Sequence, residues 1–231
     1  MNICFDPDAV SVTIVKATER GLGLSLVYGL PVSKFLQMFV MDIQKKIEKE
    51  FPQTYIWHLP SRLHVTLVRG NSSVSPLPPI NRDLLERIVS DVSKSDNFIL
   101  NFTTAHLDLA GHVQLNCIAE DLELKISEED FDKMRETAEW TLRSNSWLTI
   151  GYIGRNPNAL ESRKIWDGTT SILSEFSLRM PFKIPVKRVK LIHFSHTTFK
   201  PLSSQHLISI PLECKQASNK INIEKLFLTL V

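Results

Sequence analysis

The sequence lacks the features that mark several classes of protein. Its three cysteines are scattered without metal-ligand spacing, and their odd number argues against a disulfide framework. We therefore expect a reducing, cytoplasmic location. No apolar run reaches the roughly 18 residues that a membrane span requires. The first residues do not resemble a secretory signal peptide, so we expect no such segment.

The chain also lacks a large excess of positive or negative charge. A formal net charge of +2 over 231 residues does not by itself indicate a protein that coats nucleic acid. Segment 120–139 is acidic and segment 179–200 is basic, as solvated faces commonly are. Hydrophobic residues make up 43% and charged residues 23%. These values are typical of a globular protein with one large domain or two lobes that share a core.

Two common catalytic motifs are absent as well. Gly21 and Gly23 lack the remaining glycine of a dinucleotide fingerprint. No serine or cysteine lies in a nucleophile elbow, which makes a covalent hydrolase mechanism less favoured. The chemistry of this chain must therefore be sought among its other polar residues.

The most informative segment that is present is RLHVTLVR at residues 62–69. In a strand, successive side chains point to opposite faces, so two sets form here. One set is apolar: Leu63, Val65 and Leu67. The other set is His64, Thr66 and Val68. The imidazole can move a proton and the hydroxyl can donate to a phosphate oxygen, which together serve half of a phosphodiester reaction.

The pattern of apolar residues and turn signals predicts an α+β fold. Strands are expected over 24–30, 62–69, 98–109, 112–119, 147–153, 186–195 and 220–231, and helices over 33–51, 82–93, 127–144 and 158–176. A Ser- and Pro-rich loop over 71–79 separates two groups of these elements. We predict one bilobal domain, residues 1–231, whose antiparallel-rich sheets line a central cleft with helices outside.

A second polar pair could lie at either of two places. The letters His196-Thr197-Thr198 repeat the His-x-Thr form, and His193 offers an overlapping version. The other candidate is the strand around Trp147 and Thr149, which follows the first pair by one lobe's length, on the order of 80 residues. His196 lies considerably further along the chain.

The segment 62–69 resembles the first signature of the 2H phosphoesterase superfamily, which includes 2′-5′ RNA ligase-like proteins and cyclic phosphodiesterases. Further support comes from the helix and Pro60-Ser61-Arg62 before it, from the hairpin and helix before Trp147, and from the ending VKLIHFS at 189–195. The resemblance extends over about residues 24–212. It implies two His-x-Thr/Ser motifs, one in each lobe, that face each other across a cleft and need no metal or cofactor.

The second motif of this chain departs from that family. The family motif typically reads His-x-Thr-Ile-Gly, and here Thr149, Ile150 and Gly151 are present while Trp147 occupies the histidine position. An indole cannot transfer a proton near neutral pH. Loss of a general acid or base typically costs about 10²–10⁴ in rate. The enzyme interpretation is favoured, but Trp147 weakens it.

Three interpretations of this departure stay open. His193 or His196 supplies the missing proton transfer, or the protein binds a nucleotide or RNA end without turnover, with Trp147 stacking on a base. In the third, Trp147 belongs to the core. Four other histidines have no partner pattern and are read as structural: His58, His106, His112 and His206.

An active site would work by acid–base catalysis. The resemblance implies a metal-independent phosphodiesterase that acts on 2′,3′-cyclic phosphates or on 2′-5′-linked or cyclic nucleotides. One neutral histidine would take a proton while a protonated one gives a proton to the leaving oxygen. The catalytic candidates are His64, Thr66, His196 and Thr198. The substrate-binding candidates are Trp147, Thr149, Tyr152, Arg69 and His193.

Overall fold

Two antiparallel sheets organise the chain in a computed structural model. The structure describes residues 23–71, 82–137, 139–142, 145–194 and 204–212. The expected strand over 220–231 and the candidates His196 and Thr198 lie outside the described residues. The α+β class that the sequence predicts is confirmed.

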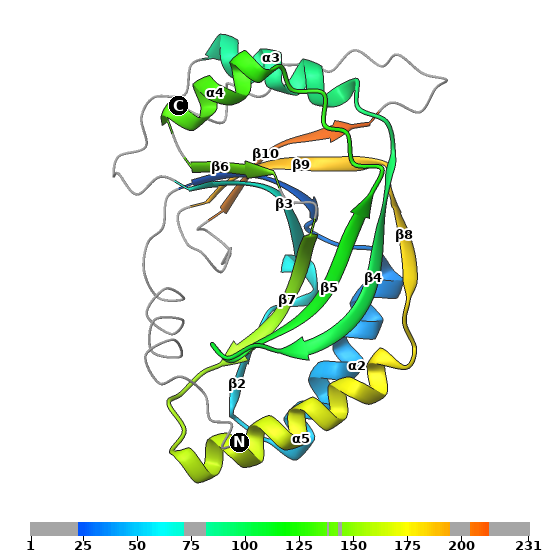
Figure 1. The fold of residues 1–231 in the computed structure, drawn as a ribbon, viewed down its shortest axis with the longest axis vertical. Coiled ribbons are helices and arrows are strands. Elements are labelled where there is room, and N and C mark those ends of the chain that lie inside the picture. The colour runs from blue at the N-terminus through cyan, green and yellow to red at the C-terminus, as the bar shows by residue number, and fades with distance from the viewer. Residues whose placement is uncertain (1–22, 72–81, 138, 143–144, 195–203, 213–231) are drawn as a thin grey trace.

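The first sheet has the strand order β10-β9-β1-β3-β6, and each neighbouring pair is antiparallel. Its strands are β1 (Gly23–Gly29), β3 (His64–Asn71), β6 (Glu139–Leu142), β9 (Arg188–Phe194) and β10 (Ser204–Pro211). Helices α3 (Arg82–Ser93) and α4 (Glu128–Thr137) lie beyond it (Figure 1). The strand that begins with His64 is therefore internal, as expected.

The second sheet has the order β2-β7-β5-β4-β8 and is also antiparallel. Its strands are β2 (Tyr55–Trp57), β4 (Phe98–Leu107), β5 (His112–Glu120), β7 (Asn145–Ile153) and β8 (Phe182–Val186). Helices α2 (Lys34–Glu50) and α5 (Ala159–Ser177) cover its outer side (Figure 1), and the 3₁₀ turn η1 (Pro60–Arg62) precedes β3. The strand that carries Trp147 is internal too.

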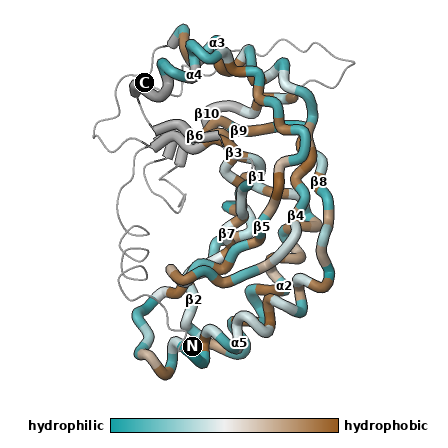
Figure 2. Tube along the Cα trace, viewed as in Figure 1, coloured by the Kyte–Doolittle hydropathy of each residue, from teal (hydrophilic) through white to brown (hydrophobic). Residues whose placement is uncertain are grey.

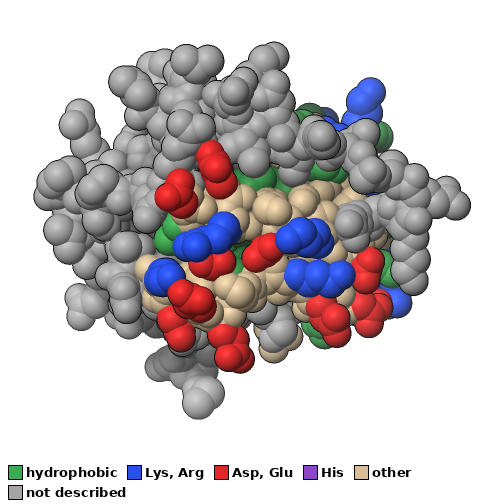
Figure 3. Space-filling view, turned by 90° about the horizontal axis from the view of Figure 1, so that it is seen from above, with side chains coloured by type: hydrophobic (Ala, Val, Ile, Leu, Met, Phe, Trp, Pro, Cys, Tyr) green, Lys and Arg blue, Asp and Glu red, His purple; other side chains and the backbone are tan. Residues whose placement is uncertain are grey.

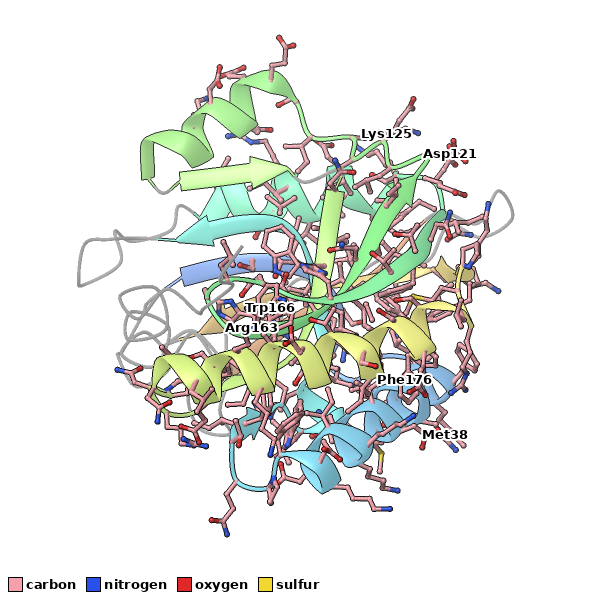
Figure 4. The ribbon with its side chains drawn as sticks, turned by 60° about the horizontal axis from the view of Figure 1, so that its bottom comes forward. Met38, Asp121, Lys125, Arg163, Trp166 and Phe176 are labelled. Carbon is pink, nitrogen blue, oxygen red and sulfur yellow. The ribbon has the colours of Figure 1, made fainter. Side chains whose placement is uncertain are left out.

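Helix α2 packs by the apolar stripe that its sequence predicts. The Ser33 hydroxyl accepts from the Leu36 N–H at 3.4 Å and so caps the helix start, as expected from the sequence. Phe39 of α2 meets Phe176 of α5 edge to face, with ring centroids 5.6 Å apart. Figure 4 shows the two helices side by side with Phe176 labelled. One buried cluster contains residues of both sheets and of these helices, so the sheets share a core.

Two predicted elements were wrong in extent. The helix expected over 127–144 ends at Thr137, and β6 then pairs with β3, with Leu142 opposite Val68. Residues 139–142 include a tryptophan and a threonine, which favour strands, and they pair along the side of β3 that β1 leaves open. The strand expected over 186–195 is two strands, because the chain leaves the second sheet after Val186 and enters the first at Arg188.

The outer helices carry mixed charge. Lys94 pairs with Asp91 at 2.8 Å and Arg87 with Asp130 at 3.1 Å. Over α3 and α4 the positive and negative side chains are intermixed (Figure 3), and α4 is largely hydrophilic where β9 is largely hydrophobic (Figure 2). This face gives no uniform attraction for a polyanion. None of the helices that the structure describes combines the length and the apolar character needed to span a membrane.

Candidate functional site

The alternation predicted for the His64 strand holds, with one exception. Val65 and Leu67 are fully buried, while His64 and Thr66 are partly exposed. Val68 was expected on the His64 face but lies in the core. The pairing with β1 shifts between Leu26 and Val27, so that Leu67 has no partner in the register and Val68 turns to the core face.

A close approach of two strands fixes the backbone at His64. Gly29 pairs with His64 and has φ +121°, and a Cβ there would come within 2.5 Å of the Leu63 carbonyl oxygen and 2.9 Å of the His64 Cα. The Leu30 N–H donates to the Leu63 carbonyl at 3.0 Å. Only glycine fits at position 29, so the start of β3 is held firmly against β1.

The ring of His64 has a defined tautomer. Its Nδ1 lies 2.9 Å from the carbonyl oxygen of Arg62, which can only accept a hydrogen bond. The proton is therefore on Nδ1, and Nε2 is the acceptor nitrogen of the neutral ring. Burial lowers the pKa of His64 to about 4, although the bond to Arg62 acts in the opposite direction. His64 is thus neutral near pH 7 and suited to accept a proton.

Thr66 lies in a row of residues that crosses three strands of the first sheet. It pairs with Val27 on β1, and Val27 pairs with Lys190 on β9. Two strand spacings separate Thr66 from Lys190, about 10 Å. The Lys190 ammonium donates to the Leu30 carbonyl oxygen, and burial, followed by the charge of Arg188, lowers the pKa of Lys190. The sequence analysis did not single out this cation.

The expected second-motif strand presents a polar face. On β5, Asn116 pairs with Trp147 and Gln114 pairs with Thr149. Trp147 is 38% exposed and lies outside the core cluster, which overturns the interpretation of this residue as part of the core. Tyr152 is buried, which raises its pKa. Trp147 and Thr149 therefore share a face of the sheet that is turned away from the core.

The two motif strands lie beside each other where the sheets meet. The Ser146 hydroxyl on β7 donates to the Thr66 carbonyl oxygen on β3 at 3.1 Å. Figure 1 shows β3 and β7 at this junction. Thr66 is one of the candidate hydroxyl residues, and Thr149, another, lies three residues beyond Ser146. The fold thus brings the first motif and the second-motif strand together.

His58 also belongs to this neighbourhood, which the sequence analysis missed. Its backbone N–H donates to the Ile150 carbonyl at 3.0 Å. Its ring meets Tyr152 edge to face, with centroids 6.1 Å apart. Burial, and then the charges of His64 and His112, lower the pKa of His58 to about 4. Three imidazoles therefore lie within electrostatic reach of one another.

His112 was missed as well. It begins β5 and pairs with Tyr152 on β7. Its Nδ1 lies 2.8 Å from Oδ2 of Asp108. A signal was present in the sequence, since Ala110-Gly111 was read as a hairpin turn, and a tight turn brings the residues on its two sides together.

The remaining candidates are placed as follows. Arg69 lies on β3 and pairs with Ser25 and Thr141. His193 lies on β9 and pairs with Leu24, so β1 separates its strand from that of His64. His196 and Thr198 are outside the described residues. No group of three or more metal-binding side chains occurs in the part of the chain that the structure describes.

Comparison with solved structures gives 14 matching chains, of which two are described here. No family model and no curated protein matches the chain. The crystal structure of TT0787 of Thermus thermophilus is 12% identical, with a TM-score of 0.49, over 82% of this chain and 97% of that one. Kluyveromyces marxianus Usb1 with uridine monophosphate is 13% identical, with a TM-score of 0.38, over 85% and 99%. At these values neither neighbour decides what this chain does.

Proposed function

We propose that this chain is a metal-independent phosphodiesterase of the 2H kind, with His64 as general base. One observation carries the proposal. His64 presents a neutral ring with its proton fixed on Nδ1 by Arg62, on the same face of β3 as Thr66. This arrangement matches the first half of a phosphodiester hydrolase site.

The hydroxyls of Thr66 and Thr149 hold the non-bridging phosphate oxygens in this proposal. Hydrogen-bond donors fixed beside a phosphate stabilise the negative charge that grows in the transition state. The Ser146 hydroxyl bonds to the Thr66 carbonyl and so links the strands that carry the two threonines. Lys190 adds a positive charge on the Thr66 face of the first sheet.

The substrate class follows from the aromatic residues of β7. Trp147 is 38% exposed and shares a face with Thr149, so a base can stack on its indole while the phosphate lies near the threonine. Base–aromatic stacking contributes about 1–3 kcal/mol in single-strand binding proteins. We propose 2′,3′-cyclic phosphates and 2′-5′-linked or cyclic nucleotides, free or at an RNA end, as substrates.

A substrate panel with EDTA tests the proposal. Wild type should hydrolyse at least one of 2′,3′-cyclic nucleotides, 2′-5′ oligoadenylates and cyclic dinucleotides, and EDTA should not reduce the rate. His64→Ala should lower kcat by about 10²–10⁴. Asp91→Ala, which removes an exposed ion pair on α3, is the control and should keep wild-type activity. Loss of activity in EDTA, or full activity in His64→Ala, contradicts the mechanism.

A nucleotide-binding protein without turnover is the second candidate. The observation that favours it is Trp147, an exposed indole where the family motif has a histidine. Binding would change the tryptophan fluorescence, and Trp147→Ala would remove most of that change. Recovery of intact ligand after long incubation with saturating wild type would leave binding as the function.

A further inference from the structure

Asp108 and His112 form a fixed pair at the turn between β4 and β5. Asp108 Oδ1 accepts from the His112 backbone N–H at 2.8 Å, and Oδ2 lies 2.8 Å from Nδ1 of the ring. The turn is closed by the Asp108 N–H, which donates to the His112 carbonyl at 3.0 Å. The carboxylate thus holds both the backbone and the ring, and the orientation of the imidazole is set before any ligand arrives.

The charge state of Asp108 suits this role. Burial by itself raises the pKa of Asp108, but the hydrogen bonds and charge of His112, together with the charge of His106, outweigh it and lower the pKa. An ionised carboxylate can only accept, so Nδ1 of His112 carries a proton. Nε2 is then the atom left for exchange with a ligand. The His112 side chain is 28% exposed, so solvent reaches it.

His112 is on the correct side of the second sheet for the candidate site. Along β5, Gln114 pairs with Thr149 and His112 pairs with Tyr152. Residues two apart on a strand share a face, so His112 lies on the face of Thr149. His58 links His112 to the first motif: its ring meets Tyr152, the strand partner of His112, with ring centroids 6.1 Å apart, and the charges of His64 and His112 both lower its pKa.

We propose that His112, positioned by Asp108, protonates the leaving oxygen in the phosphodiesterase and replaces the histidine that is missing at position 147. This inference rests on the proposed function. The water oxygen bonds to phosphorus while its proton passes to Nε2 of His64. The bond from phosphorus to the leaving oxygen breaks with its electron pair, and that oxygen takes the proton from Nε2 of His112. The products are a phosphate monoester and a free hydroxyl, and exchange with solvent restores both rings.

The titratable groups that face His112 come from several elements. Asp108 faces it from its own turn, His58 from the segment after β2, and Tyr152 from β7. His106 on β4 lies close enough to Asp108 for its charge to lower the pKa of that carboxyl. Among these described groups only Asp108 is anionic near neutral pH, and its carboxylate is the group that orients the ring of His112.

A comparison of leaving groups tests this inference directly. A general acid matters when the leaving oxygen is an alkoxide and matters little for p-nitrophenolate, which departs without a proton. His112→Ala should therefore lower kcat about 10²–10⁴-fold on a 2′,3′-cyclic nucleotide and less than about 10-fold on thymidine 5′-phosphate p-nitrophenyl ester. His64→Ala should impair both substrates. A structural defect would also affect both substrates, so the ratio separates the two roles.

The same leaving-group ratio tests the positioning role of Asp108. Asp108→Asn keeps one oxygen acceptor but loses the second, so the backbone N–H and the ring of His112 are no longer both held. The value of kcat on the 2′,3′-cyclic nucleotide should fall at least about 10-fold, while kcat on the p-nitrophenyl ester and KM should change little. Two controls lie on the same hairpin: Glu120→Gln, a partly exposed carboxylate paired with Lys183, and Ile118→Ala at an exposed position. Both should keep the wild-type ratio.

The outcomes separate the two proposals. Equal losses on both substrates in a folded His112→Ala, or an unchanged kcat on the cyclic nucleotide in Asp108→Asn, overturn the inference while His64 dependence sustains the proposed function. A wild type that turns over no diester in the panel overturns both. Thermal melting of each variant shows whether it is folded.

Discussion

Ser146 and Thr66 link the two sheets, because the Ser146 hydroxyl donates a hydrogen bond to the Thr66 carbonyl oxygen at 3.1 Å. Ser146 is 3% exposed, so this bond is shielded from water. Thr66 belongs to the first motif, and Ser146 immediately precedes the tryptophan at the second-motif position. This bond therefore links the two halves of the candidate site directly, in addition to the core that the sheets share.

Ser146→Ala should therefore lower kcat as well as the free energy of unfolding. Removal of one buried hydrogen bond costs about 1 kcal/mol in free energy of unfolding. We expect that loss in urea denaturation, together with a decrease in kcat, because the strands that carry Thr66 and Thr149 are no longer tied. The control is Ser174→Ala, whose hydroxyl bonds to the Thr170 carbonyl on the exposed side of α5. Unchanged kcat in a destabilised Ser146→Ala would contradict the positioning role.

The stability of the protein should fall in mild acid. The pKa values of His58 and His64 are lowered from 6.5 to about 4 in the folded state. Between these values the unfolded chain binds more protons than the folded one, so the free energy of unfolding decreases as pH falls through this window. The loss should be on the order of 1–3 kcal/mol for each histidine.

Urea denaturation of wild type and His64→Gln, at about pH 7.5 and about pH 5, measures this effect. The variant should show a smaller decrease, because one of the two groups is gone. A decrease of the same size in both proteins would show that His64 is not responsible. The acidic limb of kcat/KM should also lie well below the pKa of 6.5 of an ordinary histidine, because the lowered pKa of His64 keeps the general base neutral in mild acid.

Local signals predicted most of the fold. The Ser33 cap and the apolar spacing after it identified α2, and the alternation at His64 identified the polar face of β3. The sequence failed where structure depends on distant partners. Residues 139–142 form a strand because β3 lies beside them. Between β8 and β9 the chain passes from one sheet to the other at Lys187, although the sequence pattern there reads as one continuous strand.

The site was predicted only in part for the same reason. His64, Thr66 and Thr149 follow from motifs that are local in the sequence. His58 and His112 carry no motif, and only the pairing of β5 with β7 and the contact with Tyr152 bring them to the first motif. Lys190 joins Thr66 across β1, a relationship that strand order creates.

Lys190 should contribute to binding of the phosphate rather than to proton transfer. Lys190→Met keeps the apolar stem of the side chain and removes its charge. We expect KM for a cyclic nucleotide to rise about 10-fold while kcat changes little. A 10-fold change corresponds to about 1.4 kcal/mol of binding free energy, which is typical of one charge-assisted hydrogen bond. The control is Lys183→Met, an exposed lysine paired with Glu120. An equal rise in KM in the control would mean that general charge, not position, matters.

A histidine at position 147 should restore what His112 provides. If His112 is the proton donor, Trp147→His alone should change kcat by less than about 3-fold, since the role is already filled. In a His112→Ala background, Trp147→His should recover at least about 10-fold in kcat on the cyclic nucleotide, because β7 presents position 147 on the face of Thr149. Trp147→Phe in that background is the control and should recover nothing, since a phenyl ring carries no proton. If Trp147→His instead raises the activity of the otherwise wild-type chain by about 10-fold or more, the second proton-transfer role was vacant and His112 does not fill it.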